Sequence, residues 1–435
     1  MRLSRAALFG YSMLALPLAM AALPIYVHVP NYYATRLGAP LAWIGLILFA
    51  ARLLDAIQDP LLGYLSDRAA GGRWGRFALV LFGIPLLAAG FVALFQPPVS
   101  GAIAVSWWLA GSMAVVYVGF SAASVSYLAI GAELSTDYHE RTRITAARAA
   151  FGILGVLLAA TLPEVLSQHS SATSGVVKFS LLFVPVLLLC SLLTWRLTPQ
   201  RAPMRAKLQR SWTQIFVPLR QLEFRWLLAV VIPSGIAGAI PATLILFFVE
   251  DVIGTPRLSG IFLAAYFLAG ALSMPTWVAL SRRMGKKNAW LLGMLMAVAA
   301  FVWAFALGAG DVVPFAMVCV MSGVAYGAEL ALPPSILADV VDRKGSEQNA
   351  NGAYFGLWQM VEKLNLAAAA GIALPLVSLL GYEPASGSGK TLALSTTYAV
   401  LPCAIKLVGA AVLWAAPVDL RESQPGRFVT EGEGQ

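Results

Sequence analysis

Long apolar stretches alternate with short polar or charged ones along almost the whole chain. An α-helix needs about 20 consecutive, mostly apolar residues to cross the hydrocarbon core of a bilayer. The pattern predicts twelve membrane-spanning helices, near residues 8–29, 41–63, 77–95, 102–130, 145–166, 176–196, 226–249, 258–280, 289–309, 312–336, 352–380 and 393–416. Because twelve is even, both termini should lie on the same side of the membrane.

The longest polar interruption, at about residues 198–225, divides the predicted helices into six and six. We therefore expect an all-α integral membrane protein made of two six-helix bundles. The first bundle should cover residues 1–197 and the second residues 226–418, joined by a cytoplasmic middle loop. A cytoplasmic tail should follow over residues 419–435.

Two short motifs recur at nearly half the chain length. Gly63–Arg68, at the end of the second predicted helix, resembles Trp277–Arg282 at the end of the eighth. Ala132–Asp137 likewise resembles Ala338–Asp342. The repeats indicate duplication with parallel topology, and transporters built in this way bind substrate between the repeats, near the bilayer midplane.

The composition is typical of a membrane protein and argues against several kinds of site. Hydrophobic residues make up 59% of the 435 residues and charged residues only 12%, whereas soluble domains carry about 25% charged residues. The 3 cysteines form no CxxC pair and the 3 histidines are scattered, which argues against a disulfide framework and a zinc site. Because the sequence shows no Ser-His-Asp cluster and no complete phosphate-binding loop, we expect neither an enzyme nor a cofactor.

The formal net charge of +9 is a topology signal rather than a nucleic-acid patch. The termini and the loops after even-numbered helices hold 22 of the 30 lysines and arginines, and the opposite loops hold only 4. Cytoplasmic loops carry the excess of positive charge, so both termini should be cytoplasmic. Arginine outnumbers lysine and alanine is abundant, which is typical of a high-GC bacterium and predicts an inner-membrane location.

The second predicted helix carries three charges in the middle of its span. Arg52, Asp55 and Asp59 are spaced three and four residues apart, so they share one helical face. Each charge costs at least about 2.5–3.5 kcal/mol inside a membrane, and such residues face the protein interior or a water-filled cavity. Arg52 offsets one carboxylate, and the remaining negative charge favours H⁺, Na⁺ or Li⁺, because oxygen ligands suit hard cations. The alternative is an Arg–Asp–Asp network that only ties helices together.

Lys363 is a further cation inside the membrane, in the eleventh predicted helix. The neighbouring Glu362 points elsewhere, because adjacent residues do not share a helical face. Lys363 therefore needs a partner from another helix, and Asp55 or Asp59 could serve.

Three more charges lie within predicted helices and have several interpretations. Arg148 lies about one turn into the fifth helix, where it faces either a cavity or the cytoplasmic interface. Glu329 and Lys406 have no partner visible in the sequence. Each of the two could be a gate, a proton carrier or an interfacial side chain.

Three segments resemble motifs of one transporter family. They are ARLLDAIQDPLLGYLSDRAAGGRWGRF at 51–77, YLAIGAELSTDYHERTRITAARAAFG at 127–152 and ILADVVDRKG at 336–345. Together with the helix that carries Lys363, they resemble the glycoside–pentoside–hexuronide:cation symporters of the major facilitator superfamily, whose best-known member is the melibiose permease. The resemblance covers most of the chain. It implies the major facilitator fold, with alternating access coupled to a cation gradient.

The resemblance implies a cation-binding role for Asp55 and Asp59. Ser121 falls where a hydroxyl of the fourth helix joins that site, and Gln58 stands where the permease has a smaller amide. Because Gln58 departs from the family pattern, the choice among H⁺, Na⁺ and Li⁺ stays open.

The resemblance also implies substrate and gating residues. The residues expected to line the substrate cavity are Arg52, Ser124, Leu128, Arg148, Trp358 and Lys363. The residues expected to form the cytoplasmic gating loop and its counterparts are Asp67, Arg68, Arg73, Arg76, Glu133, Arg141 and Asp339.

Departures from the permease bear on the substrate. Ser124 stands where the permease has an Asp that holds galactoside hydroxyls, and Leu128 replaces an aromatic residue that stacks on the sugar. Residues 6–35 contain no acid, so a first-helix Asp of the permease has no counterpart. A polyol would leave hydrogen-bonding groups unpaired without such partners. We therefore expect a substrate other than a galactoside. A lipid-like substrate also fits, because the distantly related sodium-coupled lysophospholipid transporters have similar acids in the second helix.

Three hypotheses of function remain open. The first is a Na⁺- or H⁺-coupled secondary active symporter of a small organic solute, of the sugar or glycoside type by resemblance. The second is a transporter of lysophospholipids, drugs or other amphiphiles, and the third is a membrane receptor or scaffold without transport. We expect a monomer whose partners are a small-molecule substrate and the lipid bilayer, with no nucleic acid.

Overall fold

The structure is a computed structural model that describes residues 3–69, 76–135, 138–167, 172–199, 218–341, 351–384 and 391–416. Within these ranges the chain is helical and has no strand. The helices of the first half are α1 (Arg5–Met13), α2 (Ala15–Asn31), α3 (Leu41–Ala69), α4 (Phe77–Phe95), α5 (Ala102–Glu133), α6 (Tyr138–Ser167) and α7 (Ala172–Leu197). Those of the second half are α8 (Leu222–Phe248), α9 (Ser259–Met284), α10 (Lys286–Phe301), α11 (Val312–Val340), α13 (Asn351–Leu379), α14 (Thr391–Ser395) and α15 (Leu401–Ala415).

In the described part of the chain, twelve helical segments are long and apolar enough to cross a membrane. The first segment, Arg5–Arg36, joins α1, α2 and a short π-helical turn. The last, Thr391–Ala415, joins α14, another π-helical turn and α15. The predicted number and order of spanning helices are confirmed.

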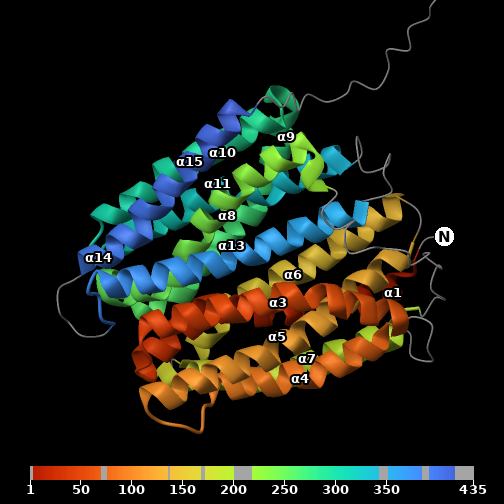
Figure 1. The fold of residues 1–435 in the computed structure, drawn as a ribbon, viewed down its shortest axis with the longest axis horizontal. Coiled ribbons are helices and arrows are strands. Elements are labelled where there is room, and N and C mark those ends of the chain that lie inside the picture. The colour runs from red at the N-terminus through yellow and green to blue at the C-terminus, as the bar shows by residue number, and fades with distance from the viewer. Residues whose placement is uncertain are drawn as a thin grey trace, which may run out of the picture.

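The helices form two bundles that lie side by side (Figure 1). α1 to α7 make up one bundle and α8 to α15 the other. The most extensive contacts between the halves are those of α3 with α13, α6 with α9, and α2 with α8. The predicted all-α, two-bundle fold is confirmed. The exact domain boundaries stay a prediction, because residues 200–217 of the middle loop and residues 417–435 of the tail lie outside the described ranges.

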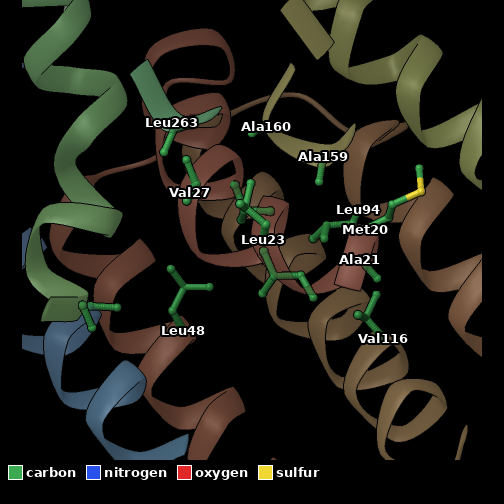
Figure 2. Close-up of a cluster of buried hydrophobic side chains, with 14 of the residues drawn as sticks. Met20, Ala21, Leu23, Val27, Leu48, Leu94, Val116, Ala159, Ala160 and Leu263 are labelled. Carbon is green, nitrogen blue, oxygen red and sulfur yellow. The ribbon is translucent and has the colours of Figure 1, made fainter. Parts of the chain in front are cut away.

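One buried apolar cluster extends across both halves (Figure 2). Met20, Leu23 and Val27 of α2 belong to it, and so does Leu263 of α9. Lipid chains are as apolar as these side chains, so apolar burial alone does not drive helices together inside a membrane. Close van der Waals packing and polar contacts between helices contribute instead.

α4 and α5 show this close packing. A Cβ atom added to Gly119 would lie 2.4 Å from the backbone nitrogen of Leu87, and one added to Gly83 would lie 2.5 Å from the Gly119 carbonyl oxygen. Glycine at both positions therefore allows the two backbones to touch.

Polar contacts join segments at the end of the molecule opposite to the start of α1 and the end of α15 (Figure 1). Asn31, the last residue of α2, donates from Nδ2 to Oε2 of Glu250 at 3.1 Å, just after α8. The Tyr382 hydroxyl, beyond the end of α13, donates to the carboxylate of Asp251. The first contact joins the two halves at this end, and the second braces the second half.

Candidate functional site

α3 presents two different faces at mid-span. Leu54 and Ile57 are 47% and 66% exposed, whereas Arg52 is 8% exposed and Asp55 is fully buried. Spacings of three and four residues place the buried charges on one face of the helix, as predicted. That face is turned toward α5 and α13, which supply its partners.

Asp55 uses both carboxylate oxygens. Its Oδ1 accepts from the Ser121 hydroxyl of α5 at 2.5 Å and from Nε2 of Gln58 at 3.3 Å. Its Oδ2 lies 3.3 Å from the Arg52 guanidinium and 2.9 Å from Nζ of Lys363. A buried carboxylate needs such partners, because an unpaired buried charge is strongly destabilising.

Lys363 reaches from α13 into the acid face of α3. Its Nζ lies 2.5 Å from Oδ2 of Asp59, 2.9 Å from Oδ2 of Asp55 and 3.4 Å from the Ser121 hydroxyl. The ammonium group therefore occupies the point on which three oxygens from two helices converge. This is the pairing expected from the sequence, and it connects the first half of the protein to the second.

The cluster is electrically balanced. Arg52 and Lys363 carry two positive charges, and Asp55 and Asp59 carry two negative ones. The three cluster residues of α3 alone carry a net charge of −1, and the positive charge of Lys363 neutralises it. Arg52 is held further by the Tyr117 ring, whose centroid lies 4.8 Å from the guanidinium carbon.

Asp59 retains one unused acceptor. Its Oδ1 is buried and has no hydrogen-bond partner among the described residues. A buried acceptor left unpaired costs about 1–3 kcal/mol, more when it is charged. This oxygen is therefore a site where a proton or a metal cation would be stabilising.

Three predicted substrate residues of the first half take no part in these ion pairs. Ser124 is partly buried on α5, where its hydroxyl donates to the Ser121 carbonyl at 3.5 Å, and Leu128, one turn further on, is 44% exposed. Arg148 on α6 is partly buried and interacts electrostatically with Tyr11 and Tyr127. In the described part of the chain none of the three bonds to Asp55 or Asp59, so their role stays a prediction.

The predicted gating residues are only partly described. Asp339, at the end of α11, forms an ion pair with Lys286 of α10 at 2.6 Å. Arg76 makes an interaction of its own at the start of α4. The remaining gating predictions lie outside the residues or side chains that the structure describes; they concern Asp67, Arg68, Arg73, Glu133 and Arg141. Gating by this set stays a prediction.

A second polar centre lies in the second half, in a cavity of about 480 Å³. Lys406 of α15 lies 3.3 Å from Oε1 of Glu329 on α11, and the Ser234 hydroxyl of α8 donates to the same oxygen at 2.8 Å. Trp358, predicted to line the substrate cavity, is here and donates from its indole nitrogen to Glu362 at 2.7 Å. Sequence reasoning noted Glu329 and Lys406 but did not pair them. The available signal was that one acid and one base lie in the membrane within the same half.

Comparison with known proteins identifies one family that matches nearly the whole chain. The model of the MFS/sugar transport protein family matches residues 8–420. The chain belongs to this family. It is therefore a multi-pass membrane transporter of the major facilitator superfamily, as the resemblance predicted.

Individual members of the superfamily are similar over different lengths. The inner membrane symporter YicJ of Escherichia coli is 21% identical over 89% of this chain and 86% of its own length. The sodium-dependent lysophosphatidylcholine symporter 1 of Xenopus tropicalis is 22% identical over 90% of this chain and 81% of its own. The major facilitator superfamily domain-containing protein 12 of horse is 34% identical, but that match spans only 30% of this chain and 28% of the horse protein.

Solved structures show the same fold. A bacterial homologue of the human lysosomal transporter Spinster, in an inward-facing and unoccupied conformation, superposes with a TM-score of 0.72. It is 15% identical, and the superposition covers 94% of this chain and 96% of that one. At this identity the likeness establishes the fold alone.

Proposed function

We propose that the protein is a cation-coupled secondary active symporter of a small organic solute, with its coupling site at Asp55 and Asp59. The observation that carries the proposal is the position of the Lys363 ammonium, 2.5 Å and 2.9 Å from the two acids. A tethered cation already sits among the oxygen ligands that a hard cation prefers. H⁺, Na⁺ or Li⁺ would compete with it for those ligands.

The competition offers a physical route to coupling. Lys363 belongs to the second half and the acids to the first, so their ion pairs tie the halves together. A cation that binds at Asp59, or a proton on it, weakens these ion pairs and changes how easily the halves separate. Linkage then requires that substrate and cation each tighten the binding of the other.

Two solute classes remain, each supported by a relative and by a feature of the chain. The family description and the E. coli symporter favour a sugar-type solute. The lysophosphatidylcholine symporter, the acid-free stretch 6–35 and the largely apolar lining of the second cavity favour an amphiphile. The bias of lysine and arginine toward one set of loops supports cytoplasmic termini. The excess of arginine over lysine and the abundance of alanine support a bacterial inner membrane.

Cation binding to the purified protein tests the coupling site without knowledge of the solute. Calorimetry with Na⁺, with Li⁺ and over a pH series should show binding or proton release in the wild type, and no such signal in Asp59→Asn. Asp339→Asn is the matched control, because Asp339 also pairs with a lysine at 2.6 Å and is similarly exposed, at 29% against 25% for Asp59. Equal signals in the wild type and Asp59→Asn would reduce the acids to a structural network.

A further inference from the structure

The cavity at the second polar centre, lined by the second half and by Tyr26 of α2, has a chemistry of its own. Aromatic and aliphatic side chains make up most of its lining, and its charged members are Glu329, Glu362 and Lys406. Glu329 and Lys406 form an ion pair at 3.3 Å, so they leave no net charge. Glu362 therefore gives the cavity a net charge of −1 when all three groups are ionised.

Glu362 is the uncompensated group. It is exposed, although it lies in the middle of a membrane-spanning helix, because it lines the cavity. Its Oε1 accepts one hydrogen bond, from the Trp358 indole nitrogen at 2.7 Å. Lys363 next to it points to Asp59 instead, and no lysine or arginine of the described segments forms an ion pair with Glu362. A carboxylate in this position attracts a positively charged ligand.

Three polar side chains of the lining are already hydrogen-bonded. The Asn365 amide donates to the Val231 carbonyl at 3.1 Å, and the Ser322 hydroxyl donates to the Val318 carbonyl at 2.6 Å. The Ser234 hydroxyl donates to Glu329. A ligand rich in hydroxyl groups would therefore depend mainly on the hydroxyls of the lining tyrosines, and buried polar groups without partners are costly.

Aromatic rings stand beside the acids. Tyr266 of α9 and Tyr326 of α11 stack with their ring centroids 5.2 Å apart, and both line the cavity together with Tyr26 of α2. Tyr326 also interacts electrostatically with Glu329 and Glu362. Aromatic faces next to a carboxylate are the surroundings in which proteins bind quaternary ammonium groups.

We propose that this cavity binds an amphiphilic organic cation, with its ammonium group between Glu362 and the Tyr326 ring and its apolar body against the lining of α8 and α9. The volume of about 480 Å³ lies within the range of pockets that hold drug-sized ligands. The proposal names a substrate class for the transport function proposed above. Only the statement that the bound cation is a transported substrate rests on that function; binding itself does not.

Equilibrium binding to the purified full-length protein in nanodiscs tests the proposal. The probes are benzyltrimethylammonium, its uncharged analogue with a tert-butyl group in place of trimethylammonium, and a methyl glucoside. We expect the wild type to bind the ammonium probe at least about tenfold more tightly than the uncharged analogue, and to bind the glucoside most weakly.

Substitutions at two residues assign the effect to the cavity. Glu362→Gln keeps an acceptor for Trp358 but removes the charge, so the preference for the ammonium probe should disappear. Tyr326→Leu should lower the affinity for the ammonium probe several-fold, while Tyr326→Phe, which keeps the ring, should not. Asp311→Asn removes an acid outside the cavity and should leave probe affinity unchanged.

Equal affinity for the two analogues in the wild type, or an unchanged preference in Glu362→Gln, would overturn the proposal. Should Glu362→Gln fail to fold, the Tyr326 pair decides in the same way, since equal loss or no loss in both variants contradicts a cation–ring contact. These results are independent of the coupling site, because inorganic cation binding is measured at Asp59 without any organic probe.

Discussion

Two charged centres lie inside the membrane-spanning region, and they differ in what they connect. In the first, Lys363 of α13 holds Asp55 and Asp59 of α3, so its ion pairs cross from one half to the other. In the second, Lys406 of α15 pairs with Glu329 of α11, and both helices belong to the second half. The first centre also has a buried, unpaired oxygen on Asp59, whereas the Glu329 oxygen accepts from both Ser234 and Lys406.

Under the functions proposed above, the first centre couples the two halves to a cation, whereas the second stabilises one half and shapes a ligand cavity. An ion pair between two bodies that rock against each other must be broken or replaced as they move, so a competing cation can bias the motion. An ion pair inside one body persists through the motion. Matched substitutions in the two centres test this difference.

The largest effect is expected for Asp55→Asn. This change leaves Arg52 and Lys363 with Asp59 as their only carboxylate in a buried cluster, and breaking a buried ion pair costs about 3–5 kcal/mol. Thermal unfolding in detergent should show a clear fall in Tm. Adding Arg52→Gln restores the charge balance and should recover part of the loss. If Asp55→Asn alone were as stable as the wild type, that result would contradict the burial of this charge network.

A smaller effect is expected for Glu329→Gln. Lys406 loses its carboxylate partner, but it lies in a cavity that water can enter and its pair is longer, at 3.3 Å. We expect a loss of about 1–3 kcal/mol, measured by the same unfolding assay. Inorganic cation binding at Asp59 should be unaffected. A change in that binding would show that the two centres are coupled.

The smallest effect on stability is expected for the alanine variants of two serines, Ser121 and Ser234. Ser121 donates to Asp55 at 2.5 Å and Ser234 donates to Glu329 at 2.8 Å. Each alanine variant should lose about 1 kcal/mol of stability, the net value of one hydrogen bond. Calorimetry should show weaker inorganic cation binding in Ser121→Ala only, since that hydroxyl lies beside the coupling site. Equal cation affinities in both variants would remove Ser121 from the site.

Much of the fold and part of the site could be predicted from the sequence, because both depend on local rules. The length of each apolar stretch determines a spanning helix, and spacings of three and four residues place Arg52, Asp55 and Asp59 on one face. Lys363 could be paired with these acids because its neighbour Glu362 lies on another face and no other charge of its helix is within reach.

The second centre could not be assembled in this way. Three helices supply its members, Ser234, Glu329 and Lys406. A sequence pattern indicates that a buried charge needs a partner, but it does not indicate which helices pack together. The cavity itself depends on the register of seven packed helices, which no local pattern encodes. The uncompensated Glu362 becomes visible only when Lys363 is seen to point the other way.

The central claim is that Lys363 occupies the place of the coupling cation. Its most direct test is the affinity for Na⁺, Li⁺ and protons in Lys363→Gln, measured by calorimetry beside Lys286→Gln, whose lysine pairs with Asp339 at a similar distance. Removing the competing ammonium should tighten cation binding by at least about tenfold in Lys363→Gln, with no change in Lys286→Gln. Unchanged or weaker cation binding in Lys363→Gln would contradict the account.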